Sequence, residues 1–247
     1  MRQTIQLTPR LRAAADWVPE GAVLCDVGTD HAHLPTALLL EGKIDRAIAS
    51  DIRPGPLGRA GDTVRRFGLE EQVELRLCPG LEGIAPGEAD AVTICGMGGE
   101  TILHILEAAP WTKQGVRLIL QPQRSQPELR RWLAANGYAV RRERMVREGA
   151  RWYALLLVEG GWEAPLSPAE ELAGRPAHWV REPERLAALR ALAEKNRRLL
   201  RGLEYSAKPE DIPRRAWLLQ AQEELTRWIE EERLRENQDG KENSNLK

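Results

Sequence analysis

The stretch LCDVGTDHAHLPTALL, residues 24–39, decides the fold of this chain. A short apolar run ends at Asp26, Gly28 follows it, and an amphipathic pattern typical of a helix begins soon after. This is the arrangement of the first strand, turn and helix of an open α/β sheet. Ligands of such sheets bind beyond the carboxyl ends of the strands, so the turn after Asp26 is the first candidate site.

Short apolar runs alternate with helical patterns through the first two-thirds of the chain. The runs predict five strands, at 22–27, 46–50, 73–77, 90–95 and 116–121. This alternation predicts a mostly parallel sheet covered by helices on both faces, the doubly wound or Rossmann-like α/β class. Segments 138–146 and 151–159 are joined by only four residues, too few for a crossover helix. They predict an antiparallel hairpin at the edge of the sheet.

The pattern changes after a turn-rich segment at 160–168. Two long helical stretches follow, at about 183–205 and 212–236. Their apolar stripes are Leu186, Leu189, Leu192, Leu199 and Leu203 on the first, and Trp217, Leu218, Leu225, Trp228 and Ile229 on the second. They predict an antiparallel helical hairpin of coiled-coil type. The predicted domains are 1–162 and 163–237, followed by a flexible polar tail at 238–247.

Composition limits the classes of function. The net charge of −1 excludes a protein that is basic throughout, so a nucleic-acid ligand needs a local positive patch. Cys25, Cys78 and Cys95 lie far apart beside apolar runs and are expected to be buried, reduced thiols. No apolar run approaches the length of a membrane span, so we expect a cytoplasmic protein without a membrane partner.

Carboxylates near the first turn indicate the kind of cofactor. A dinucleotide fingerprint needs three glycines, but only Gly28 is present, and Asp30 and Ala32 stand at the other two positions. A carboxylate here repels a pyrophosphate. S-adenosyl-L-methionine has no phosphate and carries a sulfonium and an ammonium group, which suit Asp26 and Asp30. Asp51 ends the second strand, where an acidic residue binds ribose hydroxyls. A purely structural turn is the alternative.

Two histidines flank the same turn. His31 and His33 are two residues apart and do not share a helix face, and no further cluster of ligands is near. We therefore expect no metal site. Capping of the following helix or contact with a substrate is the preferred interpretation.

The segment DAVTICGMGGETILHIL, residues 90–106, brings glycines to the same edge of the sheet. Its turn consists of Gly96, Met97, Gly98 and Gly99. Three glycines let the backbone approach a ligand closely, so the turn is a candidate platform where a target base meets the methyl donor. An ordinary βα turn is the alternative.

The fifth strand ends at the same edge with polar side chains. Gln121 and Gln123 are candidates for hydrogen bonds to a base, and Arg124 is a candidate for a phosphate contact. The polarity of a surface loop explains the same residues nearly as well.

Together these segments resemble the bacterial tRNA (adenine-N1)-methyltransferase family that modifies position 22 of tRNA, often called TrmK. The resemblance rests on DVGTDHAHLP, GLEGI, DAVTICGMGG, LILQPQ, LRRWLAANGY and the closing EGARWYALLLV, over roughly residues 5–160. It implies a class I methyltransferase that uses S-adenosyl-L-methionine, with tRNA as substrate. The implied cofactor site comprises Asp26, Gly28, Asp30, His31, Asp51, Gly80, Gly96 and Met97. The implied base site comprises Gly98, Gly99, Gln121 and Gln123.

Two positions depart from the family pattern. The family usually has Gly-Asp-Gly where this chain has Cys78-Pro79-Gly80, so the Asp expected to hold the cofactor's adenine amine is replaced by Pro79. The second strand ends in Ser50-Asp51, where related chains often have Gly-Glu. The charge is kept at Asp51, but its side chain is shorter.

The resemblance also directs attention to the catalytic group and to the RNA-binding surface. Asp30 is our candidate for stabilising the positive charge that develops on the methylated adenine. Basic residues between 181 and 201, with Arg197 and Arg198 among them, are candidates for tRNA phosphates. So are Arg141, Arg142, Arg144 and Arg147 on the edge hairpin. A solvated helix face is the commoner explanation of such a run.

Two rival functions and one unlikely class remain. The first rival is a methyltransferase that acts on another acceptor, a small molecule or a protein. The second is a non-catalytic module that holds RNA or a partner. A nicotinamide dehydrogenase is disfavoured by the missing glycines. We expect a monomer.

Overall fold

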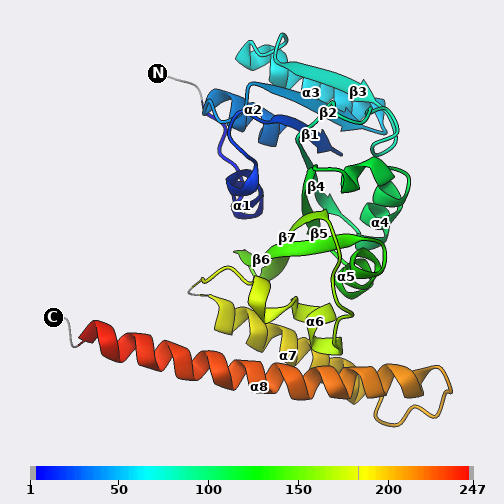
Figure 1. Cartoon of the computed structure of the whole chain (residues 1–247), viewed down its shortest axis with the longest axis vertical. Helices are drawn as coiled ribbons and strands as arrows, with labels where there is room; N and C mark the ends of the chain where they lie inside the picture. Colours follow the sequence, from blue (N-terminus) through cyan, green and yellow to red (C-terminus); the bar gives the residue numbers. More distant parts are fainter. Residues whose placement is uncertain (1–3, 183, 245–247) are drawn as a thin grey trace. The chain divides into compact units, whose positions relative to one another are not determined.

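The computed structural model describes residues 4–182 and 184–244. The chain divides into two compact units, Met1–Pro165 and Leu166–Lys247 (Figure 1). Each is described separately below.

The described part of the first unit forms a seven-stranded sheet in the order β3-β2-β1-β4-β5-β7-β6. The strands are β1 (Val23–Val27), β2 (Arg46–Asp51), β3 (Val73–Leu77), β4 (Ala91–Met97), β5 (Arg117–Pro122), β6 (Tyr138–Glu148) and β7 (Arg151–Gly160). The first five are parallel, β7 is antiparallel to β5, and β6 is antiparallel to β7. The predicted doubly wound class and its antiparallel edge hairpin are confirmed.

Helices cover both faces of this sheet (Figure 1). They are α1 (Pro9–Trp17), α2 (His33–Leu40), α3 (Pro54–Phe67), α4 (Gly99–Glu107) and α5 (Gln126–Ala135), with a short 3₁₀ turn at Pro110–Lys113. From β1 the chain moves outward to β2 and β3, whereas from β4 it moves the other way to β5. Right-handed crossovers therefore place α2 and α3 on one face and α4 on the other. The crevice between β1 and β4 is the point at which the strand order reverses.

Apolar side chains from the sheet and from α4 and α5 form the larger core. Ile94, Leu118 and Leu156 are fully buried there, and Ile102 and Leu106 of α4 pack against the same cluster. The near-continuous burial of β1, β2, β4 and β5 explains why these strands read as apolar runs.

Helix α1 was not predicted from the sequence. It begins with Pro9 after an extended Thr8, and it buries Ala13, Ala14, Ala15 and Trp17. Proline at the first helical position is a recognised start signal. The helix is short and its apolar face consists mostly of alanines, so its periodicity is weak.

The second unit contains a helical hairpin, as predicted. Its helices are α6 (Pro168–Ala173), α7 (Arg185–Gly202) and α8 (Asp211–Ser244), with a 3₁₀ turn at Pro176–His178. Asn196 of α7 donates its side-chain amide to Leu218 O of α8, while Arg185 pairs with Glu232. The start of α7 thus lies beside the later part of α8, so the two helices are antiparallel.

Three details of this unit differ from the expectation. Helix α6 begins at the last residue of the turn-rich segment and continues where no helix was predicted, and it starts with a reciprocal capping box between Ser167 and Glu170. Leu199, assigned to the apolar stripe, is exposed. Helix α8 continues to Ser244, into the predicted tail, and residues 245–247 of that tail lie outside the described residues. None of the helices in the described ranges is both long and apolar enough to cross a membrane.

Candidate functional site

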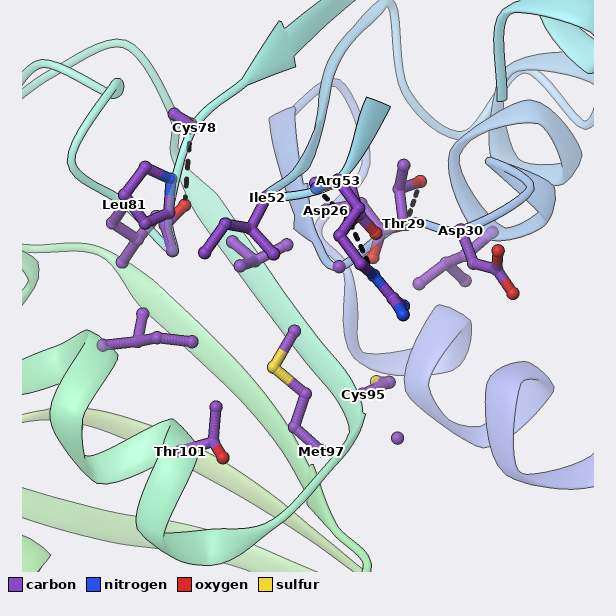
Figure 2. Close-up of a pocket in the computed structure, with 18 of the residues that line it drawn as sticks. Asp26, Thr29, Asp30, Ile52, Arg53, Cys78, Leu81, Cys95, Met97 and Thr101 are labelled. Carbon is purple, nitrogen blue, oxygen red and sulfur yellow. Dashed lines mark hydrogen bonds and ion pairs between the residues drawn. The ribbon is translucent and has the colours of Figure 1, made fainter. Parts of the chain in front are cut away.

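A cavity of about 880 Å³ opens at the carboxyl ends of the parallel strands. Its walls come from the tips of β1, β2 and β4, the loop after β3, and residues of α1 and α4 (Figure 2). Sites for small ligands usually measure roughly 300–1,000 Å³. The cavity lies where the strand order reverses, which is the position expected for the ligand of an open α/β sheet.

The cavity brings together all eight residues predicted to bind cofactor. They are Asp26, Gly28, Asp30, His31, Asp51, Gly80, Gly96 and Met97. Of the residues predicted to bind substrate, Gln123 also lines the cavity. Gly98, Gly99, Gln121 and Arg124 lie outside its lining, and Arg197 and Arg198 belong to the second unit.

Asp26, near the end of β1, is a buried carboxylate, with 6% of its surface exposed. Thr29 Oγ1 donates to its Oδ2 at 2.7 Å, and Thr93 Oγ1 of β4 donates to its Oδ1 at 2.6 Å. Burial raises the pKa of Asp26 to about 6, and the two hydroxyl donors offset only part of that rise. Asp26 therefore places a fixed negative charge in the cavity at neutral pH.

Asp51 and Ile52 form the tip of β2. Asp51 is buried, and its Oδ1 accepts from the backbone N–H of Arg53 at 2.9 Å, which leaves Oδ2 for a ligand. Ile52 lines the cavity although 64% of its surface is exposed. An exposed isoleucine beside a buried carboxylate provides an apolar wall and a hydrogen-bond acceptor at one point. Sequence reasoning missed Ile52 because a single apolar residue in a turn carries no pattern.

Asp30 has a strained backbone and an ionised side chain. It adopts φ +50°, and Ala32 adopts φ +53°, both in the left-handed region that L-residues avoid. Arg59 Nη2 of α3 donates to Asp30 Oδ1 at 2.5 Å, and this hydrogen bond lowers the pKa of Asp30. The side chain remains 55% exposed. Asp30 is thus an accessible carboxylate at the mouth of the cavity.

The histidines beside Asp30 stack on each other. The ring centroids of His31 and His33 are 5.2 Å apart, and both rings line the cavity. Burial lowers the pKa of His33. Neither histidine caps the following helix: the residue at the N-cap of α2 is Ala32, and no side chain accepts a hydrogen bond there. Within the described ranges, no three His, Cys, Asp or Glu residues are grouped to hold a metal ion.

Glycines let two strand tips approach each other. Gly28 has φ +69°, and a Cβ placed on it would lie 2.1 Å from Met97 Cε. The Met97 side chain therefore lies across the β1 turn, inside the cavity (Figure 2). Gly80, in the loop after β3, has φ +55°, and a Cβ there would lie 2.8 Å from Ile105. Both glycines allow backbone to line the cavity where a side chain does not fit.

The residues at the ends of β4 and β5 support one another rather than all facing the cavity. Gln121 is fully buried, and its amide donates to Pro122 O. The Arg124 side chain lies over Gly98, 3.0 Å from where a Cβ would stand. A Cβ on Gly99 would lie 2.4 Å from Ser125 O, so this glycine is needed for contact between two backbone segments.

The remaining wall of the cavity is mostly apolar. Pro79, Leu81, Ile105 and Ala108 line it, together with the thiol of Cys95. Burial raises the pKa of Cys95, so this thiol stays protonated and neutral. An apolar wall opposite carboxylates suits a planar heterocycle attached to a polar, positively charged chain.

These residues fit S-adenosyl-L-methionine. Asp26 and Asp30 carry negative charge of the kind that suits its sulfonium and ammonium groups, and the free oxygen of Asp51 suits a ribose hydroxyl. Gly28 supplies a backbone turn without a side chain, and Ile52 and Pro79 present apolar surface that suits adenine. Pro79 brings no acceptor for the adenine amine.

Comparison with known proteins agrees with this geometry. A family model described as a methyltransferase domain matches residues 7–156. The fold and the site thus define a methyltransferase domain of the Rossmann type. The Bacillus subtilis (strain 168) tRNA (adenine(22)-N(1))-methyltransferase is 42% identical over 158 residues, which are 64% of this chain and 66% of that protein, just under two thirds of its length.

Solved structures extend the similarity to both units. The B. subtilis m1A22 tRNA methyltransferase TrmK superposes with a TM-score of 0.78 and 31% identity, covering 91% of this chain and 99% of that one. M. capricolum TrmK, solved with the cofactor product S-adenosyl-homocysteine, superposes with a TM-score of 0.74 and 26% identity, covering 91% of this chain and 98% of that one. The chain belongs to the bacterial tRNA (adenine(22)-N1)-methyltransferase family.

Proposed function

We propose that this protein transfers a methyl group from S-adenosyl-L-methionine to N1 of an adenine in tRNA, at position 22. The observation that carries the proposal is the convergence of Asp26, Asp30 and Asp51 on one cavity beside the glycine-rich end of β4. Membership of the family supports the same reaction and the same position.

The cavity binds and orients the cofactor, which supplies an electrophilic methyl group on a sulfonium. Asp26 holds negative charge at the base of the cavity, because two threonine hydroxyls fix its carboxylate. Asp51 accepts a hydrogen bond from a ribose hydroxyl of the cofactor, and Ile52 packs on its adenine ring. This division of tasks leaves the mouth of the cavity, near Asp30 and Gly96, for the substrate base.

Adenine N1 carries an in-plane lone pair, so the acceptor needs no activation by a base. The main requirement is in-line alignment of N1, the methyl carbon and the sulfonium sulfur, because the N–C bond forms as the S–C bond breaks and S-adenosyl-homocysteine leaves. This is a positioning task. The methylated adenine is cationic near neutral pH. Asp30, kept ionised by Arg59, stabilises this charge and accepts a hydrogen bond from the exocyclic amine.

Transfer to N1 requires an exposed base and a surface that grips the tRNA backbone. In a helical region the N1 atom is paired, so the base is moved out before transfer. In the second unit, Arg197 and Arg198 are exposed and serve as phosphate contacts. On the edge hairpin Arg142 and Arg147 are exposed, whereas Arg144 pairs with Asp16. The protein acts as a monomer in the cytoplasm, where its tRNA substrate is found.

The deciding experiment is incubation of the purified chain with unmodified tRNA and S-adenosyl-L-methionine, followed by mass mapping of modified nucleosides. We expect 1-methyladenosine at position 22. A tRNA with guanosine at that position is the matched control and is expected to take up no methyl group.

Two outcomes overturn the proposal, and each supports one rival. Cofactor binding by calorimetry without methyl transfer to any RNA supports a non-catalytic binding module. Transfer of labelled methyl to a protein or small molecule, but not to tRNA, supports another acceptor. The molar mass of the free protein, measured by light scattering, tests whether it is a monomer.

A further inference from the structure

Arg10, on the first turn of α1, is a cation inside the cavity that the proposed chemistry has not used. It lines the cavity with 24% of its side chain exposed. A Cβ placed on Gly96 would lie 3.6 Å from Arg10 Nη1 and 3.7 Å from Gln123 Nε2. The guanidinium and this amide therefore converge on the end of β4. The carboxylates lie on different strands, at the tips of β1 and β2, so the cavity has a negative part and a donor-rich part.

The protein holds Arg10 in a fixed orientation. Its Nη1 donates to Gln121 Oε1 at 3.1 Å, its Nε lies 3.4 Å from Glu148 Oε1, and its guanidinium lies 5.4 Å from the ring centroid of Tyr153. Nε is buried and its ion pair lacks hydrogen-bond geometry. Nη2 has no hydrogen-bond partner among the described residues and is not among the buried atoms. One face of the guanidinium fork is thus anchored, and one nitrogen is left for a ligand.

The chemistry of this donor-rich part selects one group of the cofactor. S-adenosyl-L-methionine carries a single anionic group, the α-carboxylate of its methionine moiety. The Nη2 group left free on Arg10 donates a charge-assisted hydrogen bond to a carboxylate oxygen, and the planar guanidinium fixes the direction of that bond. A carboxylate facing Arg10 also keeps its distance from Asp26 and Asp51, which repel it.

We propose that Arg10 binds the α-carboxylate of the cofactor, with the Gln123 amide as a second donor. This inference rests on the proposed cofactor. A phosphate of the tRNA is the competing ligand. The carboxylate is favoured because Arg10 is largely buried inside the cavity and anchored toward Gly96, whereas a phosphate contact requires an exposed arm.

The test compares two ligands that differ only in the carboxylate, S-adenosyl-homocysteine and its decarboxylated analogue, by calorimetry. Arg10→Met keeps the aliphatic stem but removes the charge. We expect it to weaken S-adenosyl-homocysteine binding by about ten- to hundredfold, the usual loss for a charged hydrogen bond. Binding of the decarboxylated analogue is expected to change by less than about twofold. Arg12→Met, on the same helix but paired with Glu41 at the surface, is the matched control.

Arg10→Lys provides a second variant that retains the charge near Glu148. It is expected to lose part of the affinity for S-adenosyl-homocysteine and none for the analogue. An equal loss for both ligands, in either variant, means that Arg10 only shapes the cavity and overturns the proposal. Unchanged cofactor binding with weakened tRNA binding overturns it in favour of the phosphate. Failure of the unmodified protein to bind S-adenosyl-homocysteine is a separate result, because it removes the proposed function itself.

Discussion

The side-chain oxygen of Gln121 on β5 accepts a hydrogen bond from the backbone N–H of Gly96 on β4, over 3.1 Å. Gly96 is the extra residue of a bulge, because Cys95 pairs with Gln121 and Met97 pairs with Pro122. The fully buried Gln121 therefore holds the bulge that carries the cavity edge, rather than reaching a base.

Replacement of Gln121 by leucine leaves the Gly96 N–H and the Arg10 guanidinium without their acceptor. An unsatisfied buried polar group costs about 1–3 kcal/mol, so we expect Gln121→Leu to lower the free energy of unfolding by about that amount. Urea denaturation measures the change. Gln126→Leu, which removes only a 3.4 Å hydrogen bond to Pro122 O, is the control. Equal stability of the two variants contradicts the role assigned to Gln121.

Cofactor affinity is expected to depend on pH through Asp26. Its pKa is about 6, so the carboxylate is ionised above that pH and attracts a cationic ligand. Affinity for S-adenosyl-L-methionine should therefore fall as the pH is lowered from about 7 to about 5. Asp26→Asn should bind more weakly and lose this pH step. A step of the same size in the variant assigns the titration to another group.

The raised pKa of Asp26 makes the stability of the free protein change with pH in the opposite direction to cofactor affinity. Because the folded state raises the pKa of Asp26 from 3.8, it holds that proton more tightly than the unfolded chain does. Protonated Asp26 therefore favours the folded state. This stabilisation is fully present below about pH 4 and is lost as the pH rises through about 6. Unfolding curves of the unmodified protein and Asp26→Asn should converge at acid pH and separate, in favour of the variant, near neutrality.

Asp30→Ala tests the proposed catalytic carboxylate. Loss of one preorganised group that stabilises developing charge typically costs about 10²–10³ in kcat, while tRNA affinity should stay within a few-fold. Single-turnover methyl transfer and filter binding measure the two quantities. Asp62→Ala, an exposed carboxylate paired with Arg65 on α3, is the control. Full activity of Asp30→Ala removes Asp30 from the mechanism.

Charge reversal on α7 tests the RNA-binding surface. Arg197 and Arg198 are exposed, and Arg197 shares Glu194 with Arg201. If both residues contact phosphates, Arg197→Glu/Arg198→Glu should weaken tRNA binding and flatten the plot of log K against log salt by about 1–2 units of slope. The same reversal at Arg65 and Arg66 on α3 is the control. An unchanged slope means that the two arginines only face solvent.

A buried ion pair connects α5 to the edge hairpin. Arg130 Nη2 lies 2.7 Å from Glu143 Oε2, and both side chains are buried. Burial raises the pKa of Glu143, although Arg130 opposes the rise. Arg130→Met leaves the carboxylate uncompensated and should cost about 3–5 kcal/mol of unfolding free energy. Arg130→Met/Glu143→Leu should recover most of that loss in urea denaturation; a double variant no more stable than the single one contradicts this account.

The sequence by itself determined the strands, the doubly wound order and the meeting of Asp26, Asp30 and Asp51 at one edge. These follow from local features: burial on both faces makes a strand apolar, and parallel strands all end at the same edge. The helical hairpin was equally readable, because its apolar stripe repeats at helical spacing over many turns.

Only the tertiary structure decided which side chains at that edge face the cavity. The bulge at Gly96 redirects the end of β4, and Gln121 turns inward to support it. Helix α1 brings Arg10 to Gln121 from 111 positions away in the chain. Contacts between residues so distant in sequence leave no periodic pattern, because each depends on how separate strands and helices pack. The direction of a side chain at a strand tip is therefore a property of the assembled sheet.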